Sequence, residues 1–144
     1  MRFGTRVTIF IDRFKRSVRR GTRTGLNRTA ALIRKEARES LRIRKKASAP
    51  GTPPSAHTRA GLREINYFVE NDLRAYIGPR KFKRSSFTNR PVPNIHEKGG
   101  TVLDQVRRKS VIKQFPERSF MWHAVKKLKA KGKLNSQFRY TVRG

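Results

Sequence analysis

The sequence predicts a small α+β protein in which one long amphipathic helix and a short C-terminal helix pack on a small, mostly antiparallel sheet, with long basic loops. Helical periodicity runs through Arg13–Arg42, and a second apolar stripe at helical spacing lies in Glu117–Leu128. Alternating apolar and polar residues in Asn66–Gly78 indicate paired strands. These three signals together are typical of a helix-on-sheet fold.

Charge is the dominant feature of the composition. Among 144 residues, 37 are Lys or Arg and 9 are Asp or Glu, which gives a net charge of +28. Such self-repulsion favours an anionic partner, either nucleic acid or an acidic protein. An apolar fraction of 35% predicts a thin core. The chain length favours one domain, assigned to 1–128, with a basic loop at 79–94 and a basic tail at 129–144.

Several classes are disfavoured by what the sequence lacks. The chain has no cysteine, so it has neither disulfides nor thiolate chemistry. No stretch approaches the roughly 18 apolar residues of a membrane span, and no secretory leader is recognisable. We therefore expect a soluble chain, made inside the cell, that does not contact a membrane.

The N-terminal third is expected to be a strand followed by the long helix. Phe3–Asp12 alternates, with Val7, Ile9 and Ile11 on one side, and is interpreted as a half-buried strand. On a helical wheel, Arg13–Arg42 then separates an apolar face from a cationic one. The cationic residues proposed to contact nucleic acid or an acidic partner are Arg13, Arg16, Arg20, Arg23, Arg34 and Arg38.

Four residues of this helix have more than one interpretation. Gly21 and Gly25 each weaken the helix, which indicates either close approach of another backbone or a bend at this point. Glu36 and Glu39 lie on the apolar side. They pair either with a neighbouring subunit or with arginines three or four residues away, and the local pairing is favoured.

The segment Ala49–Phe68 is interpreted as a rigid corner between the helix and the sheet, in preference to a plain surface loop. Its prolines fix φ, and Gly51 is free of Cβ restrictions. A short helix capped by Thr58 is expected to follow, with Leu62 and Ile65 on one face. The structural residues proposed for the corner are Pro50, Gly51, Pro53, Thr58, Leu62 and Ile65.

A hairpin and a basic loop are predicted next. Asn66–Glu70 and Leu73–Gly78 are expected to pair around a tight turn at Asn71-Asp72. The loop Pro79–Asn94 shows no periodicity and carries interleaved phenylalanines, which either stack on bases or cover the sheet edge. Its charges are proposed to bind phosphate, through Arg80, Lys81, Lys83 and Arg84.

The C-terminal third is expected to hold four further elements. Ile95–Val102 reads as a helical turn ended by glycines, and Val106–Phe115 as a strand. Pro116 should open a helix over Glu117–Leu128, with Glu117 favourably placed in its first turn. The tail, Lys129–Gly144, alternates at Phe138, Tyr140 and Val142 and could form an edge strand.

Catalytic and cofactor signatures are lacking. His96-Glu97 begins like a zinc-protease motif, but Gly100 stands where the second histidine would be needed. No phosphate-binding glycine loop, nucleophile elbow or carboxylate pair is present, so no enzyme activity, metal or cofactor is expected. No base-reading module is recognisable either, so any contact with nucleic acid should be to its backbone.

Three segments resemble a known family. The corner PGTPPSAHT with its following Leu62 and Ile65, the turn HEKGGT, and the helix start PERSF occur in the order found in the neck and tail-component proteins of tailed bacteriophages. These are the small head–tail joining or tail-completion proteins. The matching residues are Pro50, Gly51, Pro53, His57, Thr58, Leu62, Ile65, His96, Glu97, Gly99 or Gly100, Thr101, Pro116, Arg118, Phe120 and Ala124.

The resemblance implies a structural virion protein, assembled in the host cytoplasm and without catalytic activity. Such proteins form a homo-oligomeric ring around the DNA channel, usually a hexamer and sometimes a dodecamer. The implied partners are adjacent head-completion or connector proteins, tail proteins and packaged DNA. Structural or inter-subunit roles would extend to His96, Glu97, Pro116 and Phe120. The alternatives are a ribosomal-type or a nucleoid-type basic protein.

Overall fold

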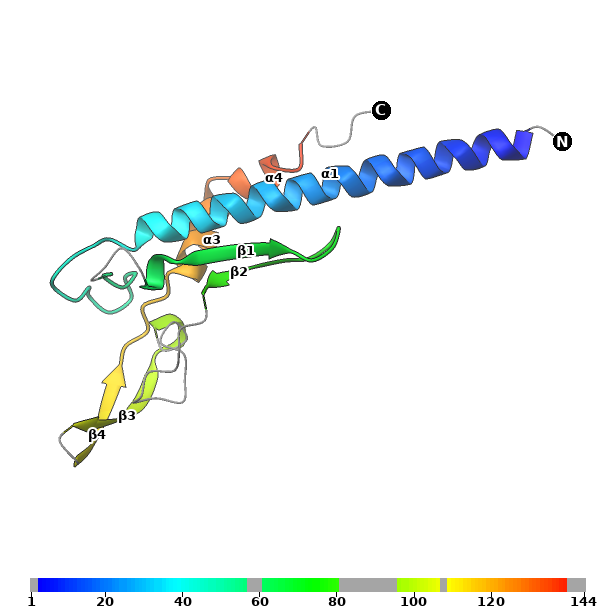
Figure 1. Cartoon of the computed structure of the whole chain (residues 1–144). Coiled ribbons are helices and arrows are strands. Elements are labelled where there is room, and N and C mark those ends of the chain that lie inside the picture. Colours follow the sequence, from blue (N-terminus) through cyan, green and yellow to red (C-terminus); the bar gives the residue numbers. More distant parts are fainter. Residues whose placement is uncertain (1–2, 57–60, 81–95, 107–108, 140–144) are drawn as a thin grey trace.

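The computed structural model describes residues 3–56, 61–80, 96–106 and 109–139, and it has the predicted α+β architecture (Figure 1). One long helix spans much of the molecule. A hairpin and a short helix pack against its C-terminal half, and a second hairpin extends away from them. The elements are α1 (Phe3–Ser40), the 3₁₀ turn η1 (Gly61–Arg63), β1 (Ile65–Val69), β2 (Ala75–Pro79), β3 (Gly100–Val106), β4 (Lys109–Phe115), α3 (Met121–Ala130) and α4 (Lys133–Ser136).

The predicted strand Phe3–Asp12 is wrong, because α1 already begins at Phe3. The apolar residues Phe3, Val7, Phe10 and Phe14 are spaced four, three and four apart, which suits one side of a helix. That longer helical pattern outweighs the short alternation around Val7. The helix ends at Ser40 rather than Arg42.

The first hairpin is confirmed, with a longer turn than predicted. β1 and β2 pair antiparallel, from Ile65 opposite Pro79 to Val69 opposite Ala75. Residues 70–74 connect them, and the Leu73 amide donates to Asn71 Oδ1 at 2.9 Å. This local side-chain turn replaces the two-residue turn expected from Asn71-Asp72.

The second hairpin was only half predicted. β4 lies within the expected strand Val106–Phe115, but β3 begins in residues assigned to a helical turn and continues through 103–105, for which no structure was predicted. The helical turn is confined to residues 96–98, and β3 starts directly at Gly100. β3 and β4 form their own two-stranded sheet, so the expected single sheet is in fact two hairpins.

The C-terminal helix starts later than predicted. α3 begins at Met121, so Glu117 lies before the helix and not in its first turn. Beyond α3, residues 133–136 form α4, and Phe138 lies in a turn directly after it. Tyr140 and Val142 of the predicted edge strand lie outside the described residues.

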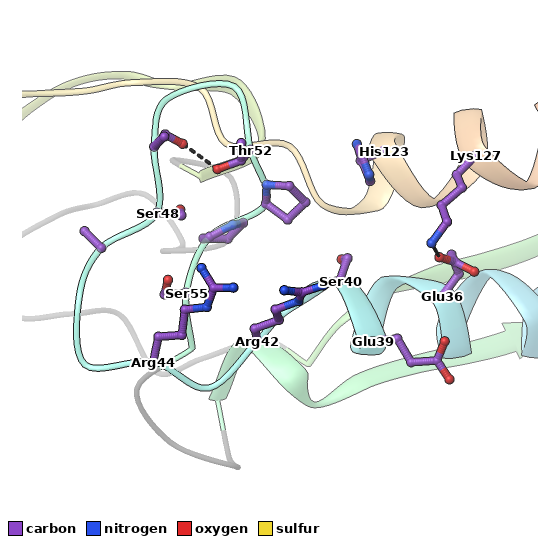
Figure 2. Close-up of a pocket in the computed structure, with 14 residues that line it drawn as sticks. Glu36, Glu39, Ser40, Arg42, Arg44, Ser48, Thr52, Ser55, His123 and Lys127 are labelled. Atoms are coloured by element: carbon purple, nitrogen blue, oxygen red, sulfur yellow. Dashed lines mark hydrogen bonds and ion pairs between the residues drawn. The ribbon is translucent and has the colours of Figure 1, made fainter.

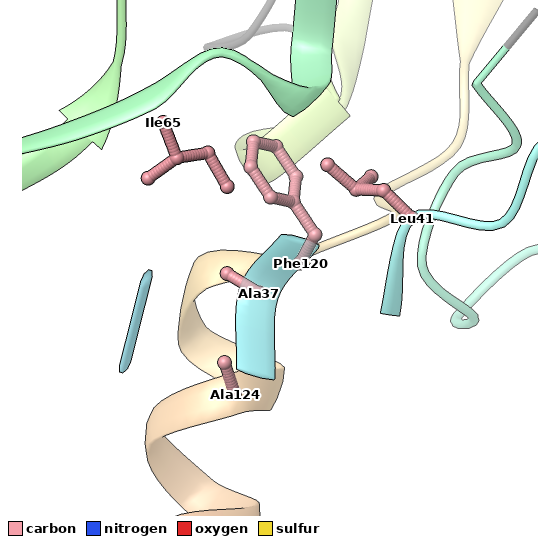
Figure 3. Close-up of a cluster of buried hydrophobic side chains, with 5 residues drawn as sticks. All are labelled: Ala37, Leu41, Ile65, Phe120 and Ala124. Carbon is pink, nitrogen blue, oxygen red and sulfur yellow. The ribbon is translucent and has the colours of Figure 1, made fainter. Parts of the chain in front are cut away.

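The core is small and lies where α1, β1 and α3 meet (Figure 3). Phe120 is its largest side chain and is 1% exposed. It packs with Ala37, Leu41, Ile65 and Ala124. The chain exposes 11812 Å² in total, whereas a compact monomer of its mass would expose about 7,600 Å². The molecule is therefore extended, as Figure 1 shows.

Gly25 lies in the middle of α1 because an aromatic ring packs on it. A Cβ at this position would stand 2.4 Å from Cδ1 of Phe138. The close approach expected at the two helix glycines is thus found at Gly25, but it is made by a side chain and not by a backbone. This contact holds the segment after α4 against α1.

Gly25→Ala should therefore stabilise the protein only when Phe138 is also replaced. Alanine gains about 1 kcal/mol of helix propensity over glycine, but in the native chain its methyl group displaces the Phe138 ring. We expect the full gain in a Phe138→Ala background and a smaller gain, or a loss, with Phe138 present. A double-mutant cycle in chemical denaturation measures the difference. Equal effects in both backgrounds would contradict this contact.

Candidate functional site

The corner, the His96-Glu97 turn and the segment before α3 contact one another directly. The Gly51 amide donates to the Glu117 carbonyl at 3.0 Å. Arg118 links the other two segments, since its amide donates to the His96 carbonyl at 2.8 Å and its Nε to the Ser48 carbonyl at 3.1 Å. We call this set of contacts, made by residues 48–56, 96–101 and 115–122, the junction.

The Glu97 carboxylate caps the start of α3. Oε2 accepts the amides of Phe120 and Met121 at 3.1 and 3.3 Å, and Oε1 accepts the Trp122 amide at 2.9 Å. Oε1 also accepts the Ser119 hydroxyl at 2.7 Å. A carboxylate at this position satisfies amides that lack partners within the helix and opposes the positive end of its dipole. The sequence predicted that Glu117 would provide the negative charge at the start of this helix. In the structure Glu97, 20 residues earlier, provides it.

Glycine at position 99 lets the junction close. Gly99 has φ of +65°, and a Cβ there would stand 2.9 Å from the Glu117 nitrogen and 3.0 Å from the Phe115 oxygen. The side chain of any other residue would clash with the backbone of the facing segment, and its own backbone would be strained at this positive φ. Gly100 then pairs with Phe115 as the first rung of the β3–β4 hairpin.

His96 is half-buried in the junction. Burial lowers its pKa, and the positive charge of Arg118 lowers it further. Its Nδ1 is buried and has no hydrogen-bond partner among the described residues. The junction therefore favours the neutral imidazole.

The stability of the protein should consequently fall in mild acid. The unfolded chain binds a proton at His96 near the ordinary pKa of about 6.5, whereas the folded chain binds it only at lower pH. This contribution is complete above about pH 6.5 and is lost as the pH falls towards the folded-state pKa. Denaturant titrations between pH 7.5 and 5 should show the decline, and His96→Asn should make it shallower. The same substitution at the exposed His123 is the control; an unchanged slope in His96→Asn would refute the idea.

The other predicted residues of the corner lie in or beside the junction. Ile65 is fully buried, but in β1 and not in the predicted helix. Leu62 lies in η1 and packs against the core. Gly51 adopts φ of +75°, as expected for a turn glycine. Pro53 and Pro116 are half-buried and Pro50 is exposed. Thr58 lies outside the described residues.

Two of the predicted contact arginines do not face outward. Arg38 donates from Nε to the Arg63 carbonyl at 3.1 Å and from a terminal nitrogen to the Ile65 carbonyl at 3.0 Å. The Arg34 guanidinium lies 5.4 Å from the centre of the Tyr67 ring, at cation–π distance. Both side chains fasten α1 to the hairpin, so their placement on the outer cationic face is wrong.

The other four predicted contact arginines of α1 are exposed. The N-terminal part of α1 extends past the tip of the β1–β2 hairpin (Figure 1). We call residues 3–23 of α1 the arm. Arg80 is also exposed and lies 3.9 Å from Glu64. Lys81, Lys83 and Arg84 lie outside the described residues, so phosphate binding by the basic loop stays a prediction. The exposed arginines of the arm are Arg13, Arg16, Arg19, Arg20 and Arg23, and Arg19 lies 3.9 Å from Asp72 of the hairpin turn.

The two glutamates on the apolar side of α1 have different partners. Glu39 pairs with Lys35 one turn away, at 4.0 Å, which is the favoured local pairing, but with a lysine and not an arginine. Glu36 instead bonds to Lys127 of α3, a pairing that the sequence did not suggest. The hydrogen bond from Lys127 lowers the pKa of Glu36. The link between α1 and α3 is therefore an ion pair at any pH above the ordinary pKa range of a carboxyl group.

A cavity of about 610 Å³ lies beside this ion pair, between the end of α1, the corner and α3 (Figure 2). Arg42 and Arg44 line it on one side and His123 and Lys127 on the other. Its lining mixes both charges, because Glu36 and Glu39 also contribute. Such a lining offers hydrogen bonds and ion pairs to a polypeptide but no arrangement of catalytic groups.

Two further observations and the comparisons bear on the class of protein. The described residues contain no group of three or more His, Asp or Glu side chains placed to hold a metal ion. Among these residues, no helix is both long and apolar enough to cross a membrane. Comparisons with protein-family models, curated proteins and solved structures found no match for this chain.

Proposed function

We propose that this chain is a structural protein of the tailed-bacteriophage virion, which forms a ring in the neck at the head–tail interface and surrounds the DNA channel. The observation that carries the proposal is the junction. The three short motifs that resemble the neck family are far apart in sequence, yet they bond to one another directly. Motifs that build one structural unit are better support for a resemblance than three independent matches.

The shape of the molecule also supports assembly. A surface about one and a half times that of a compact monomer leaves extensive area for neighbours. Large apolar side chains are exposed on several elements, including Phe14, Phe68, Leu73 and Ile112. A hexamer is favoured over a dodecamer, with head-completion or connector proteins and tail proteins as neighbours.

The exposed arginines of the arm give the proposed ring its contact with DNA or with acidic protein. Their contact with DNA would be to backbone phosphates, through charge alone. Imaging of assembled particles tests the proposal directly: density for this chain should form a ring at the head–tail junction. Its placement anywhere else in the particle, or its absence from particles, would rule the proposal out.

The second candidate is a nucleic-acid-binding protein of nucleoid or ribosomal type. The observation that favours it is the same arm, whose arginines are exposed in the isolated chain. This candidate predicts tight duplex binding that weakens steeply between about 50 and 200 mM salt. A binding titration at two salt concentrations tests the nucleoid type, and co-sedimentation with ribosomes in high salt tests the ribosomal type.

A further inference from the structure

A single parallel β-bridge directly after α1 sets the direction of two arginines. The bridge joins Ile43 to Ala56. The Arg44 amide donates to the Ala56 carbonyl at 3.1 Å, and the Ala56 amide donates to the Arg42 carbonyl at 2.9 Å. Because side chains alternate along an extended chain, Arg42 and Arg44 lie on the same side, opposite to Ile43. Both line the cavity between the end of α1, the corner and α3 (Figure 2), and we call them the arginine pair.

The other strand of the bridge adds a hydroxyl group to the same wall. Ser55 directly precedes Ala56, so the parallel pairing puts its side chain on the side of the arginine pair, and Ser55 also lines the cavity. Pro53 and Pro54 come before it, and Pro54 is buried. Since proline fixes φ, a paired and rigid backbone holds this wall of the cavity in place.

The arginine pair is available to an anion. Among the described residues, neither guanidinium group forms an ion pair or a hydrogen bond. The two arginines are two residues apart on an extended chain, so their Cα atoms are separated by about 6.5 Å. One carboxylate can therefore reach both of these long side chains. Two positive charges at this separation also attract an anion more strongly than either charge alone.

The two acids that line the cavity do not neutralise the arginine pair. Glu36 bonds to Lys127 of α3, and its side chain is only 14% exposed. Glu39 pairs with Lys35 at 4.0 Å, and its side chain is 58% exposed. His123 lines the cavity from α3. The cavity therefore has a basic wall at the corner and one exposed carboxylate, that of Glu39, on the α1 side (Figure 2).

This mixed lining suits a polypeptide better than a nucleic acid. Every nucleotide carries a phosphate, so a strand in the cavity would bring negative charge to Glu39 as well as to the arginine pair. A polypeptide can place a carboxylate at the arginine pair and backbone amides at Glu39, whose carboxylate accepts hydrogen bonds. The volume of about 610 Å³ is also within the range of pockets that enclose a ligand.

The occupant comes from a different protein and not from a second copy of this chain. The chain has 9 acidic residues among 144, none of them adjacent to another, so it has no acidic segment to offer. Two copies with a net charge of +28 would also repel each other. Several acids outside the cavity already have partners within the chain, and these are Glu64, Glu70, Asp72 and Glu97.

We propose that this cavity binds an acidic segment of a different protein, with one carboxylate held between the guanidinium groups of Arg42 and Arg44 and accepting the hydroxyl of Ser55. The planar fork of a guanidinium group matches the two oxygens of a carboxylate, which a lysine ammonium group cannot do. The inference deepens the proposed function, because it names the surface that receives a neighbouring connector or tail protein. It rests on that function only for the identity of the neighbour.

Fluorescence anisotropy with the full-length chain tests the site at about 0.15 M salt, where charges more than about 8 Å apart are largely screened. The probe is a labelled, amide-capped peptide of alternating glutamate and glycine, and its glutamine analogue is the uncharged control. Arg42→Lys/Arg44→Lys keeps the charge of the cavity but removes the forks. Arg20→Lys/Arg23→Lys is the matched control, since both arginines are exposed on the arm. Circular dichroism checks that both variants are folded.

The expected result is that Arg42→Lys/Arg44→Lys binds the glutamate peptide about tenfold more weakly, the factor that follows from losing a hydrogen bond to a charged group. The arm variant should stay within about twofold of the native chain, and the glutamine peptide should bind neither. Equal losses in the two variants, or no loss in either, would overturn the inference, because binding would then depend on net charge alone.

A single-stranded DNA oligonucleotide of the same charge as the peptide is the competing probe. If its affinity fell in Arg42→Lys/Arg44→Lys as much as that of the peptide, the cavity would be a phosphate site and the inference would be wrong. The assay uses the isolated chain, so it does not depend on where the chain lies in a particle. Peptide binding by a chain that is absent from the head–tail junction would sustain the site and refute the proposed function. Rings at the junction without peptide binding would do the reverse.

Discussion

Replacing Phe120 with alanine should lower the free energy of unfolding by about 3–5 kcal/mol, the cost typical of a fully buried aromatic residue. The reason for a value at the upper end is the smallness of the core. Phe120 is the largest fully buried side chain among the described residues, and its neighbours include two alanines, Ala37 and Ala124, which cannot fill the space it leaves. Since domains of this size are stabilised by about 5–15 kcal/mol, this one substitution removes a large share of the total stability.

Trp122 supplies the matched control for this variant. It is two residues further along the chain, is 56% exposed, and contacts Lys126 through a cation–π interaction at 5.7 Å. Trp122→Ala should therefore cost about 1 kcal/mol or less. Denaturation of both variants, followed by circular dichroism, gives the comparison. Similar losses for the two substitutions would mean that the cluster in Figure 3 is not the main core.

Local patterns were sufficient to predict the elements whose residues interact with near neighbours. The helical periodicity of α1 and α3, and the alternation in β1 and β2, arise from one buried face along a short stretch of chain. The predicted N-terminal strand was wrong because it too was read from a short local pattern. Alternation at Val7, Ile9 and Ile11 is compatible with either state, and the decisive helical spacing becomes visible only when Phe3 and Phe14 are included.

Long-range partners could not be predicted from such patterns. Arg38 looks like any other surface cation in the sequence, and only the fold brings it to the carbonyls of Arg63 and Ile65. Gly25 likewise gave no sign that Phe138, more than a hundred residues away, would lie against it. The prolines and Gly51 of the corner predicted a rigid segment, but its contacts with Glu117 and Arg118 depend on how three separate segments meet.

Glu97→Ala should be the most destabilising change of a partly exposed residue in the junction, with a loss of about 2–3 kcal/mol. Loss of an N-cap side chain alone costs about 0.5–2 kcal/mol, and hydrogen bonds to a charged group contribute about 1.5–3 kcal/mol each. The substitution leaves the amides of Phe120, Met121 and Trp122 without their acceptor. It also detaches residues 96–98 from α3, so the β3–β4 hairpin that follows should become more mobile. Hydrogen exchange at these three amides measures the local effect, and denaturation measures the global one.

Two further variants complete the test. One removes the charge of Glu97 but keeps its shape, and the other changes Glu117, which the sequence placed at the start of the helix. Glu97→Gln keeps one oxygen acceptor of nearly the same shape, so it should lose only part of the stability, chiefly the interaction with the helix dipole. Glu117→Gln tests the residue that the sequence placed at the helix start; its side chain is exposed before α3, so the change should be close to neutral. If Glu117→Gln lowered the stability as much as Glu97→Ala, Glu117 and not Glu97 would be the residue that caps α3. The expected order, with Glu97→Ala largest and Glu117→Gln smallest, would instead mean that the start of α3 is specified by a turn about 20 residues away, and that the junction folds as one unit.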